Sequence, residues 1–159
     1  MSTTEPGISF RELLAYTDYL AKRWLAYFEN NPSALDIDVG GRTGSMRQLV
    51  NHIFQVEQLF ASRLLQKDPL SVLESPTTGQ LLQLHQTSHE QLSGYIASLG
   101  EEELQQSQTI GPTTASNRKI LAQICLHGVH TWAQIAMEVR QAGFPTEKPQ
   151  DIIITDVMT

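Results

Sequence analysis

The longest apolar stretch of the chain spans residues 115–143 and reads ASNRKILAQICLHGVHTWAQIAMEVRQAG. At about 100° per residue, its apolar side chains fall on nearly every side of a helix. Gly143 is the expected C-terminal cap, because glycine readily adopts the left-handed conformation in which helices commonly end. The stretch therefore predicts a helix over about 115–142, surrounded by other parts of the protein.

This predicted helix has nearly the length of a membrane span but not its composition. Residues 120–137 contain no Asp, Glu, Lys or Arg, and such a length approaches the ~18 apolar residues of a typical span. Polar side chains interrupt the segment, and they would be costly to place in hydrocarbon. We therefore expect protein around this helix, not lipid. The polar side chains are Gln123, His127, His130, Thr131 and Gln134.

Three further amphipathic segments precede this helix. Their apolar residues recur at three- and four-residue steps over about 9–30, 46–66 and 78–99. Ser45 and Gln48 form the sequence pattern of a capping box at the start of the second segment. Four helices joined by short to moderate links predict an all-α fold, an antiparallel four-helix bundle.

A single domain accounts for the whole chain. Its 159 residues contain no internal repeat or low-complexity tract, and this length is usual for one domain. We expect one domain over 1–159, with an ordered core over about 8–145 and a short extended tail over 146–159. Within that tail, Ile152–Ile154 predicts a short strand or an extended clamp on the bundle.

The charge of the chain narrows the classes of possible partner, and its cysteine content bears on its cellular location. The formal net charge is −6 and no basic cluster stands out, which argues against nucleic acid and anionic membranes as partners. Cys125 is the single cysteine and cannot form an internal disulfide. The first residues also lack the basic and apolar regions of a signal peptide. A reducing cytoplasm is the expected location.

The histidines on the second and fourth predicted helices are the candidate functional residues. His52 flanks the apolar stripe of one helix, and His127 lies in a polar strip on the other. Neutral imidazole nitrogen binds zinc, nickel, copper and iron, so the pair predicts a divalent metal site if the helices are neighbours. From spacing alone, however, two hydrogen-bonded histidines without a metal are favoured, because buried polar groups merely need partners. Glu57, near the middle of the apolar stripe, requires a partner of its own.

A competing pair lies on the third predicted helix. His85 and His89 are four residues apart, as are the two histidines of a zincin helix. His89 and Glu90 begin an HExxH pattern, but Ser93 occupies the position of its second histidine. The stretch also fits a solvated polar face without a metal.

The sequence around these histidines resembles the motifs of the DinB/YfiT-like superfamily. Residues 45–53, SMRQLVNHI, followed by Glu57, are similar to its second-helix signature, and residues 127–143 are similar to its fourth. The resemblance implies a four-helix bundle, commonly a homodimer, with a divalent metal held by one histidine of the second helix and an HxxxH pair of the fourth. Characterised relatives include metal-dependent thiol S-transferases that use low-molecular-weight bacterial thiols, and mycothiol-dependent isomerases.

The implied metal site is altered in this sequence. His52 matches the ligand of the second helix and His127 matches the first histidine of the HxxxH pair, but the second position is Thr131. A threonine hydroxyl is a poor ligand for zinc or nickel. His130, one position earlier, is the candidate substitute, and Glu57 is another possible ligand or support. The expected set is His52, His127 and His130 around the metal, with Glu57, Thr131 and Gln134 lining the cavity.

Two classes of function follow from this resemblance. The first is a transferase that uses zinc or nickel to bind and acidify a thiol for attack on an electrophile. The second is a bundle that has lost the metal and binds a small molecule in its cavity, as Thr131 would indicate. The sequence names neither the substrate nor a catalytic side chain.

Overall fold

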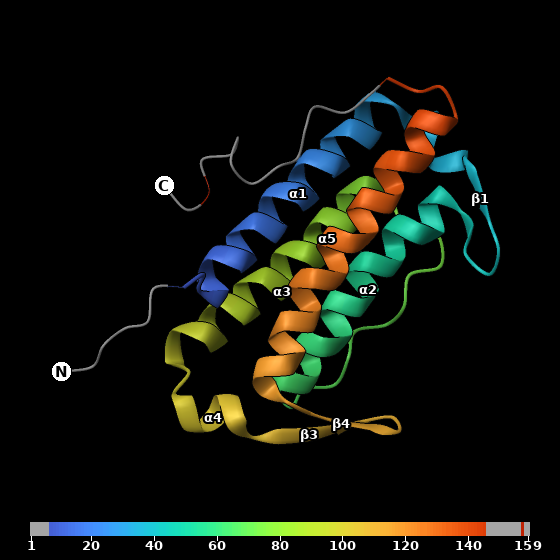
Figure 1. Cartoon of the computed structure of the whole chain (residues 1–159). Coiled ribbons are helices and arrows are strands. Elements are labelled where there is room, and N and C mark those ends of the chain that lie inside the picture. Colours follow the sequence, from blue (N-terminus) through green and yellow to red (C-terminus); the bar gives the residue numbers. More distant parts are fainter. Residues whose placement is uncertain (1–6, 146–156, 158–159) are drawn as a thin grey trace.

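Four long helices form a bundle in the computed structural model, which describes residues 7–145 and residue 157 (Figure 1). All four predicted helices are confirmed, with ends within two residues of those expected. Two short helices, η1 and α4, lie in the connections. The helices are α1 (Phe10–Asn30), η1 (Pro32–Asp36), α2 (Met46–Leu64), α3 (Thr78–Ser98), α4 (Glu101–Gln105) and α5 (Asn117–Gln141).

Each long helix begins at a hydroxyl side chain that accepts a hydrogen bond from the backbone of its first turn. The predicted capping box of α2 is confirmed, because Gln48 N donates to Ser45 Oγ and Ser45 N donates to Gln48 Oε1. Capping of this kind is worth about 1 kcal/mol per helix. At the other end of α5, Gly143 has a φ of +79°, as expected of a glycine cap. The capping hydroxyls belong to Ser9, Ser45, Thr77 and Ser116.

The core consists of two apolar clusters, one at each end of the bundle. The larger joins the end of α1 to the starts of α2 and α3 and the end of α5, where Trp24 stacks on Trp132 with ring centroids 5.8 Å apart. The smaller joins the start of α1 to the ends of α2 and α3 and the start of α5. Helices α1 and α5 therefore run in one direction, and α2 and α3 run in the other.

The expected antiparallel arrangement holds for two of the four neighbouring pairs. Helix α1 packs against α3 and α5, and α2 also packs against α3 and α5. The pairs α1/α3 and α2/α5 are antiparallel, whereas α2/α3 and α1/α5 are parallel. The physical reason is the connection 65–77, which returns the chain along the bundle before α3 begins (Figure 1). Asn51 Nδ2 ties this connection to α2 by donating to the Leu73 carbonyl at 2.6 Å.

Two small hairpins lie in the links between the predicted helices. One pairs β1 (Asp38–Gly40) with β2 (Gly44–Ser45), and the other pairs β3 (Ser107–Ile110) with β4 (Thr113–Ser116). Gly111, at a φ of +57°, and Pro112 form the two-residue turn of the second hairpin. The extended tail expected over 146–159, including the Ile152–Ile154 segment, lies outside the described residues except for residue 157.

Helix α5 is not enclosed on every side. Leu126 and Met137 are 60% and 46% exposed, so the expectation of a helix surrounded by protein is wrong for this face. Among the helices that the structure describes, none combines the length and hydropathy needed to span a bilayer. The polar side chains within α5 explain this result, because they lower the hydropathy of an otherwise apolar segment.

Candidate functional site

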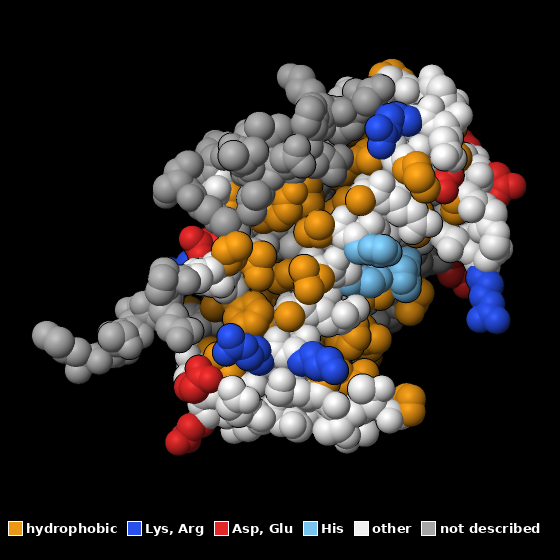
Figure 2. All heavy atoms as spheres, in the orientation of Figure 1, with side chains coloured by type: hydrophobic (Ala, Val, Ile, Leu, Met, Phe, Trp, Pro, Cys, Tyr) orange, Lys and Arg blue, Asp and Glu red, His pale blue; other side chains and the backbone are white. Residues whose placement is uncertain are grey.

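His52 and His127 meet across the antiparallel pair α2 and α5. Their ring centroids are 5.1 Å apart and their planes are inclined by 71°. Figure 2 shows a patch of histidine side chains on the face that these two helices form. The side chain of His52 is exposed and that of His127 is half-buried. The fold therefore brings together the two histidines that the sequence singled out.

Both rings keep their nitrogen atoms free. Within residues 7–145, neither His52 nor His127 forms a hydrogen bond or ion pair through its ring, which argues against the interpretation of two hydrogen-bonded bundle histidines. Burial, reinforced by the neighbouring His52 and His130, lowers the pKa of His127. This shift favours the neutral form of His127, the state in which imidazole binds a metal.

The third ligand position of the implied metal site is occupied by a residue that is not a histidine. Thr131 is buried, and its Oγ1 donates to the carbonyl of His127 at 2.9 Å, so its hydroxyl serves the helix backbone. His130 is exposed one residue earlier, and Gln134 is exposed one turn later. Among the residues that the structure describes, no three His, Cys, Asp or Glu side chains are grouped closely enough to hold a metal.

A cavity lies further along the same two helices. It has a volume of about 240 Å³ and is bounded by α2, α5 and the hairpin β3–β4. Its walls are mainly apolar, and Lys119 and Gln123 bring polar groups to it. Phe60 lies about two turns beyond His52, and Gln123 about one turn before His127. The lining residues are Phe60, Ile110, Thr113, Ala115, Lys119, Ile120 and Gln123.

The DinB family model matches residues 1–152 of the chain. The chain belongs to the DinB family. The match covers the four long helices and so confirms the resemblance drawn from the sequence. No curated protein matches this DinB protein.

The metal site implied by the resemblance fits this DinB protein in two of its three ligand positions. The imidazole nitrogens of His52 and His127 have no hydrogen-bond partner among the described residues, and the rings lie close enough to share one ion. Thr131 offers an oxygen that is a poor ligand for zinc or nickel and is already bonded to the backbone. A metal held by the two imidazoles alone would keep several coordination positions for water, a substrate or His130.

Glu57 has the partner that its burial requires. Its two carboxylate oxygens lie 2.9 and 3.3 Å from His85 Nδ1, and Asp18 Oδ1 lies 3.0 Å from His85 Nε2. The described hydrogen bonds of Glu57 thus lead to His85 of α3, and through His85 to Asp18 of α1, instead of to His52 or His127. This Asp18–His85–Glu57 network joins three helices of the DinB bundle. Lys22 Nζ adds a further ion pair to Asp18 at 2.8 Å.

His85 carries a positive charge at neutral pH although it is fully buried. Burial disfavours this charge, but hydrogen bonds to Asp18 and Glu57 outweigh it and raise the pKa of His85 to about 9. Burial likewise disfavours the Asp18 carboxylate, but hydrogen bonds from His85 and Lys22 hold the pKa of Asp18 well below its ordinary range. Both ring nitrogens of His85 therefore donate to carboxylates, which leaves neither of them to share a metal with His89.

The buried Cys125 is held in its thiol form. Burial, reinforced by the charge of Glu57, raises the pKa of the Cys125 thiol to about 12. Nucleophilic attack requires the thiolate, which is negligible at neutral pH for such a group. Any sulfur chemistry at the histidine pair therefore needs a thiol brought by the substrate.

Proposed function

We propose that this DinB family protein is a divalent-metal-dependent thiol S-transferase whose metal, zinc or nickel, is held by His52 and His127 with His130 as the third ligand. The observation that carries the proposal is the pair of rings whose centroids lie 5.1 Å apart, with no ring hydrogen bond to any other described residue. The lowered pKa of His127 supports it, because a neutral imidazole does not have to lose a proton before binding.

Each part of the site has a distinct role in this proposal. A bound divalent metal supplies Lewis acidity, which lowers the pKa of a thiol placed on it. His52 and His127 hold the ion, and the exposed face of α2 and α5 admits the substrate. The cavity of about 240 Å³ along these helices accommodates the electrophile, with Phe60 against its apolar part and Lys119 beside any negative charge.

Metal affinity tests the first half of the proposal. We expect H52A and H127A to bind zinc at least about tenfold more weakly than the wild type, because each removes one of two preorganised imidazoles. Plasma mass spectrometry of untagged protein gives the metal content, and a competitive zinc indicator gives the affinity. H89A is the matched control, since it removes a histidine of α3 instead. Equal zinc affinity in wild type, H52A and H127A would contradict the proposal.

A substitution at Thr131 provides a complementary test, in which zinc affinity is expected to rise. Thr131→His restores the HxxxH spacing that the resemblance implies, and we expect it to tighten zinc binding at least about tenfold. Because Thr131 is buried, circular dichroism first establishes that the variant folds. H130A separates the two candidates for third ligand: it weakens zinc binding in the wild type and leaves binding unchanged in the Thr131→His background.

Thiol consumption tests the second half. We expect metal-stimulated consumption of bacillithiol, mycothiol or glutathione with a panel of electrophiles, and the loss of this activity in H127A. Such thiols are kept reduced in the cytoplasm, the location that a lone buried cysteine also suits. No consumption by fully metal-loaded protein would contradict transferase activity while leaving the metal site intact.

Thr131 favours one alternative function. Its buried hydroxyl is bonded to the backbone of α5, which is a stable arrangement without any metal. In the alternative, the bundle binds a small molecule beside the histidine pair and performs no metal chemistry. Substoichiometric zinc after reloading, together with a ligand-induced rise in Tm in the presence of chelator, would support it.

The proposal includes a homodimer. Leu126 and Met137 are exposed apolar side chains on one side of α5, and exposed apolar side chains of this kind are common in contacts with a partner. We expect light scattering of the purified protein to give twice the mass of 17.8 kDa, and L126E to shift it to the monomer. A monomeric wild type would contradict this part of the proposal.

A further inference from the structure

A second cavity lies between α1 and α3, on the opposite side of the bundle from the histidine pair. Helices α1 and α3 form one antiparallel pair, and α2 and α5 form the other. The cavity has a volume of about 320 Å³, at the lower end of the ~300–1,000 Å³ of small-molecule pockets. The lining residues are Arg11, Leu14, Ala15, His89, Ser93, Ile96 and Ala97.

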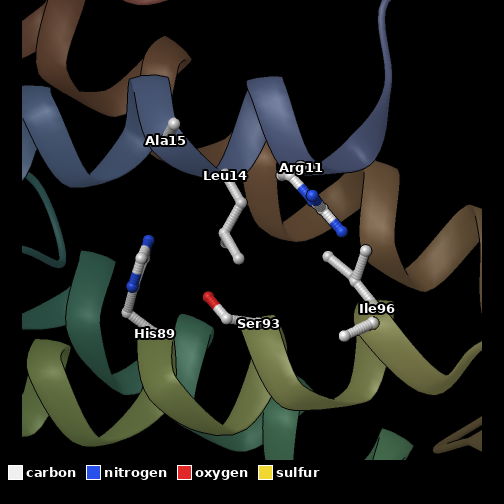
Figure 3. Close-up of a pocket in the computed structure, with 7 residues that line it drawn as sticks. Arg11, Leu14, Ala15, His89, Ser93 and Ile96 are labelled. Atoms are coloured by element: carbon white, nitrogen blue, oxygen red, sulfur yellow. The ribbon is translucent and has the colours of Figure 1, made fainter.

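The walls of this cavity are apolar along most of their length. Figure 3 shows Leu14 and Ser93 pointing towards one another from the two helices, between His89 on one side and Arg11 on the other. Leu14 is buried, and Ile96 is partly covered. Leu14 and Ile96 therefore give the middle of the cavity an apolar wall, beside the Ser93 hydroxyl, that favours the hydrocarbon part of a ligand.

Arg11 gives one end of the cavity a positive charge that is not neutralised. Within residues 7–145 it has no ion-pair partner, and the nearby Glu12 is engaged in capping Ser9 at 2.7 and 2.8 Å. An arginine guanidinium presents a planar fork of donors that matches a carboxylate. This end therefore complements a carboxylate in both charge and shape.

His89 gives the other end a polar atom in need of a partner. Its Nε2 is buried and has no hydrogen bond among the described residues. A buried polar atom without a partner costs about 1–3 kcal/mol, and a ligand that supplies the missing hydrogen bond recovers part of that free energy. A hydroxyl fits this position whichever tautomer His89 adopts, because it both donates and accepts.

We propose that the cavity between α1 and α3 binds a small amphipathic carboxylate. Its carboxylate pairs with Arg11, its apolar body lies against Leu14 and Ile96, and a hydroxyl at its far end bonds His89 Nε2. This site is independent of the histidine pair of α2 and α5, so it neither requires the metal nor depends on the transferase activity.

Three probes of one size test this chemistry. They are 3-(4-hydroxyphenyl)propanoate, the same molecule without its hydroxyl, and 3-phenylpropanamide, which lacks the charge. Calorimetry in the presence of chelator keeps metal binding out of the measurement. We expect the hydroxylated carboxylate to bind the wild type most tightly. The amide, which lacks the hydroxyl as well as the charge, should bind at least about tenfold more weakly than the carboxylate without the hydroxyl, since only the charge-assisted bond to arginine is lost between those two.

Variants place the binding in this cavity. R11Q is expected to weaken the carboxylates about tenfold and leave the amide unchanged, whereas R118Q, the matched change on α5, has no effect. Ala97→Phe fills the cavity from an exposed position and abolishes binding of all three probes. H89F removes the preference for the hydroxylated carboxylate over its parent. Arg11, Ala97 and Arg118 are exposed, so these changes are compatible with folding.

The proposal is overturned by any of three results. One is the absence of binding by the hydroxylated carboxylate at millimolar concentration. Another is equal affinity of R11Q and wild type for that carboxylate. The third is a set of amide shifts in nuclear magnetic resonance spectra that maps to α2 and α5 instead of α1 and α3. Loss of zinc binding in H52A leaves all three measurements unaffected, so the two proposals fail separately.

Discussion

The variant His85→Leu is expected to lose about 3–5 kcal/mol of unfolding free energy, which is a large part of the total stability of a typical domain. The wild-type imidazolium donates to Glu57 at 2.9 Å and to Asp18 at 3.0 Å. Leucine leaves Glu57, which is only 6% exposed, as a buried carboxylate without its described partner. Asp18 is affected less, because it keeps Lys22 and part of its side chain reaches solvent.

Urea unfolding followed by circular dichroism measures this loss. The double variant E57L/H85L is the informative companion, because replacing both members of a buried ion pair by apolar side chains is often close to neutral. We expect it to recover at least half of the stability that H85L loses. H89L, one turn along the same helix, is the matched control and should cost less than about 1.5 kcal/mol, since Nε2 of His89 has no described partner. A cost below about 1 kcal/mol for H85L would show that the network contributes little.

The second large expected effect is a fall in stability of about 3 kcal/mol as the pH rises from 6.5 to 9. His85 has an ordinary pKa of 6.5 when the chain is unfolded and a pKa of about 9 when it is folded. The folded state therefore holds its proton more tightly. The resulting stabilisation is complete below pH 6.5 and is lost as the pH rises through 9.

Other groups with altered pKa values titrate outside this window. The pKa of His127 is lowered from 6.5, so its contribution changes in acid. The raised pKa of Cys125 matters above its ordinary value of 9.0, and the lowered pKa of Asp18 matters below its ordinary value of 3.8. Urea midpoints at a series of pH values check the prediction. H85Q cannot titrate and should show a flat profile in this window, and a wild-type profile that is equally flat would refute the assignment.

The positions of the helices could be predicted from the sequence because their signals are local. Apolar periodicity and the Ser45/Gln48 capping pattern involve residues within one or two turns, and the helix ends follow from them. The directions of the helices could not be predicted in the same way. They depend on the path of the connection 65–77, which Asn51 fixes through a contact 22 residues away in sequence. The hairpins were not predicted, because strands of two to four residues are too short to show a clear alternation of polar and apolar side chains.

The candidate site was predictable in part for the same reason. His52 and His127 were selected by their positions in sequence motifs, and the antiparallel packing of α2 and α5 brings them together. Glu57 signalled a missing partner by lying in an apolar stripe, but nothing local in the sequence identified that partner as His85. Asp18 was missed entirely. Asp18 and Lys22 have the i,i+4 spacing of an ordinary ion pair on a helix surface. Only the fold shows that His85 also lies beside Asp18.

The path of the chain between α2 and α3 also bears on how quickly the protein reaches its native state. The first two long helices are consecutive in sequence, yet α1 finds its main neighbours in α3 and α5, much further along the chain. A hairpin of two consecutive antiparallel helices that pack together is therefore not part of the native structure, so it cannot serve as an early folding intermediate with native contacts. High contact order slows folding, so we expect slower refolding than for an up-and-down bundle of the same length. Until α3 and α5 have been synthesised, the nascent chain has little with which to cover the apolar face of α1, and this interval is when it is most exposed to aggregation.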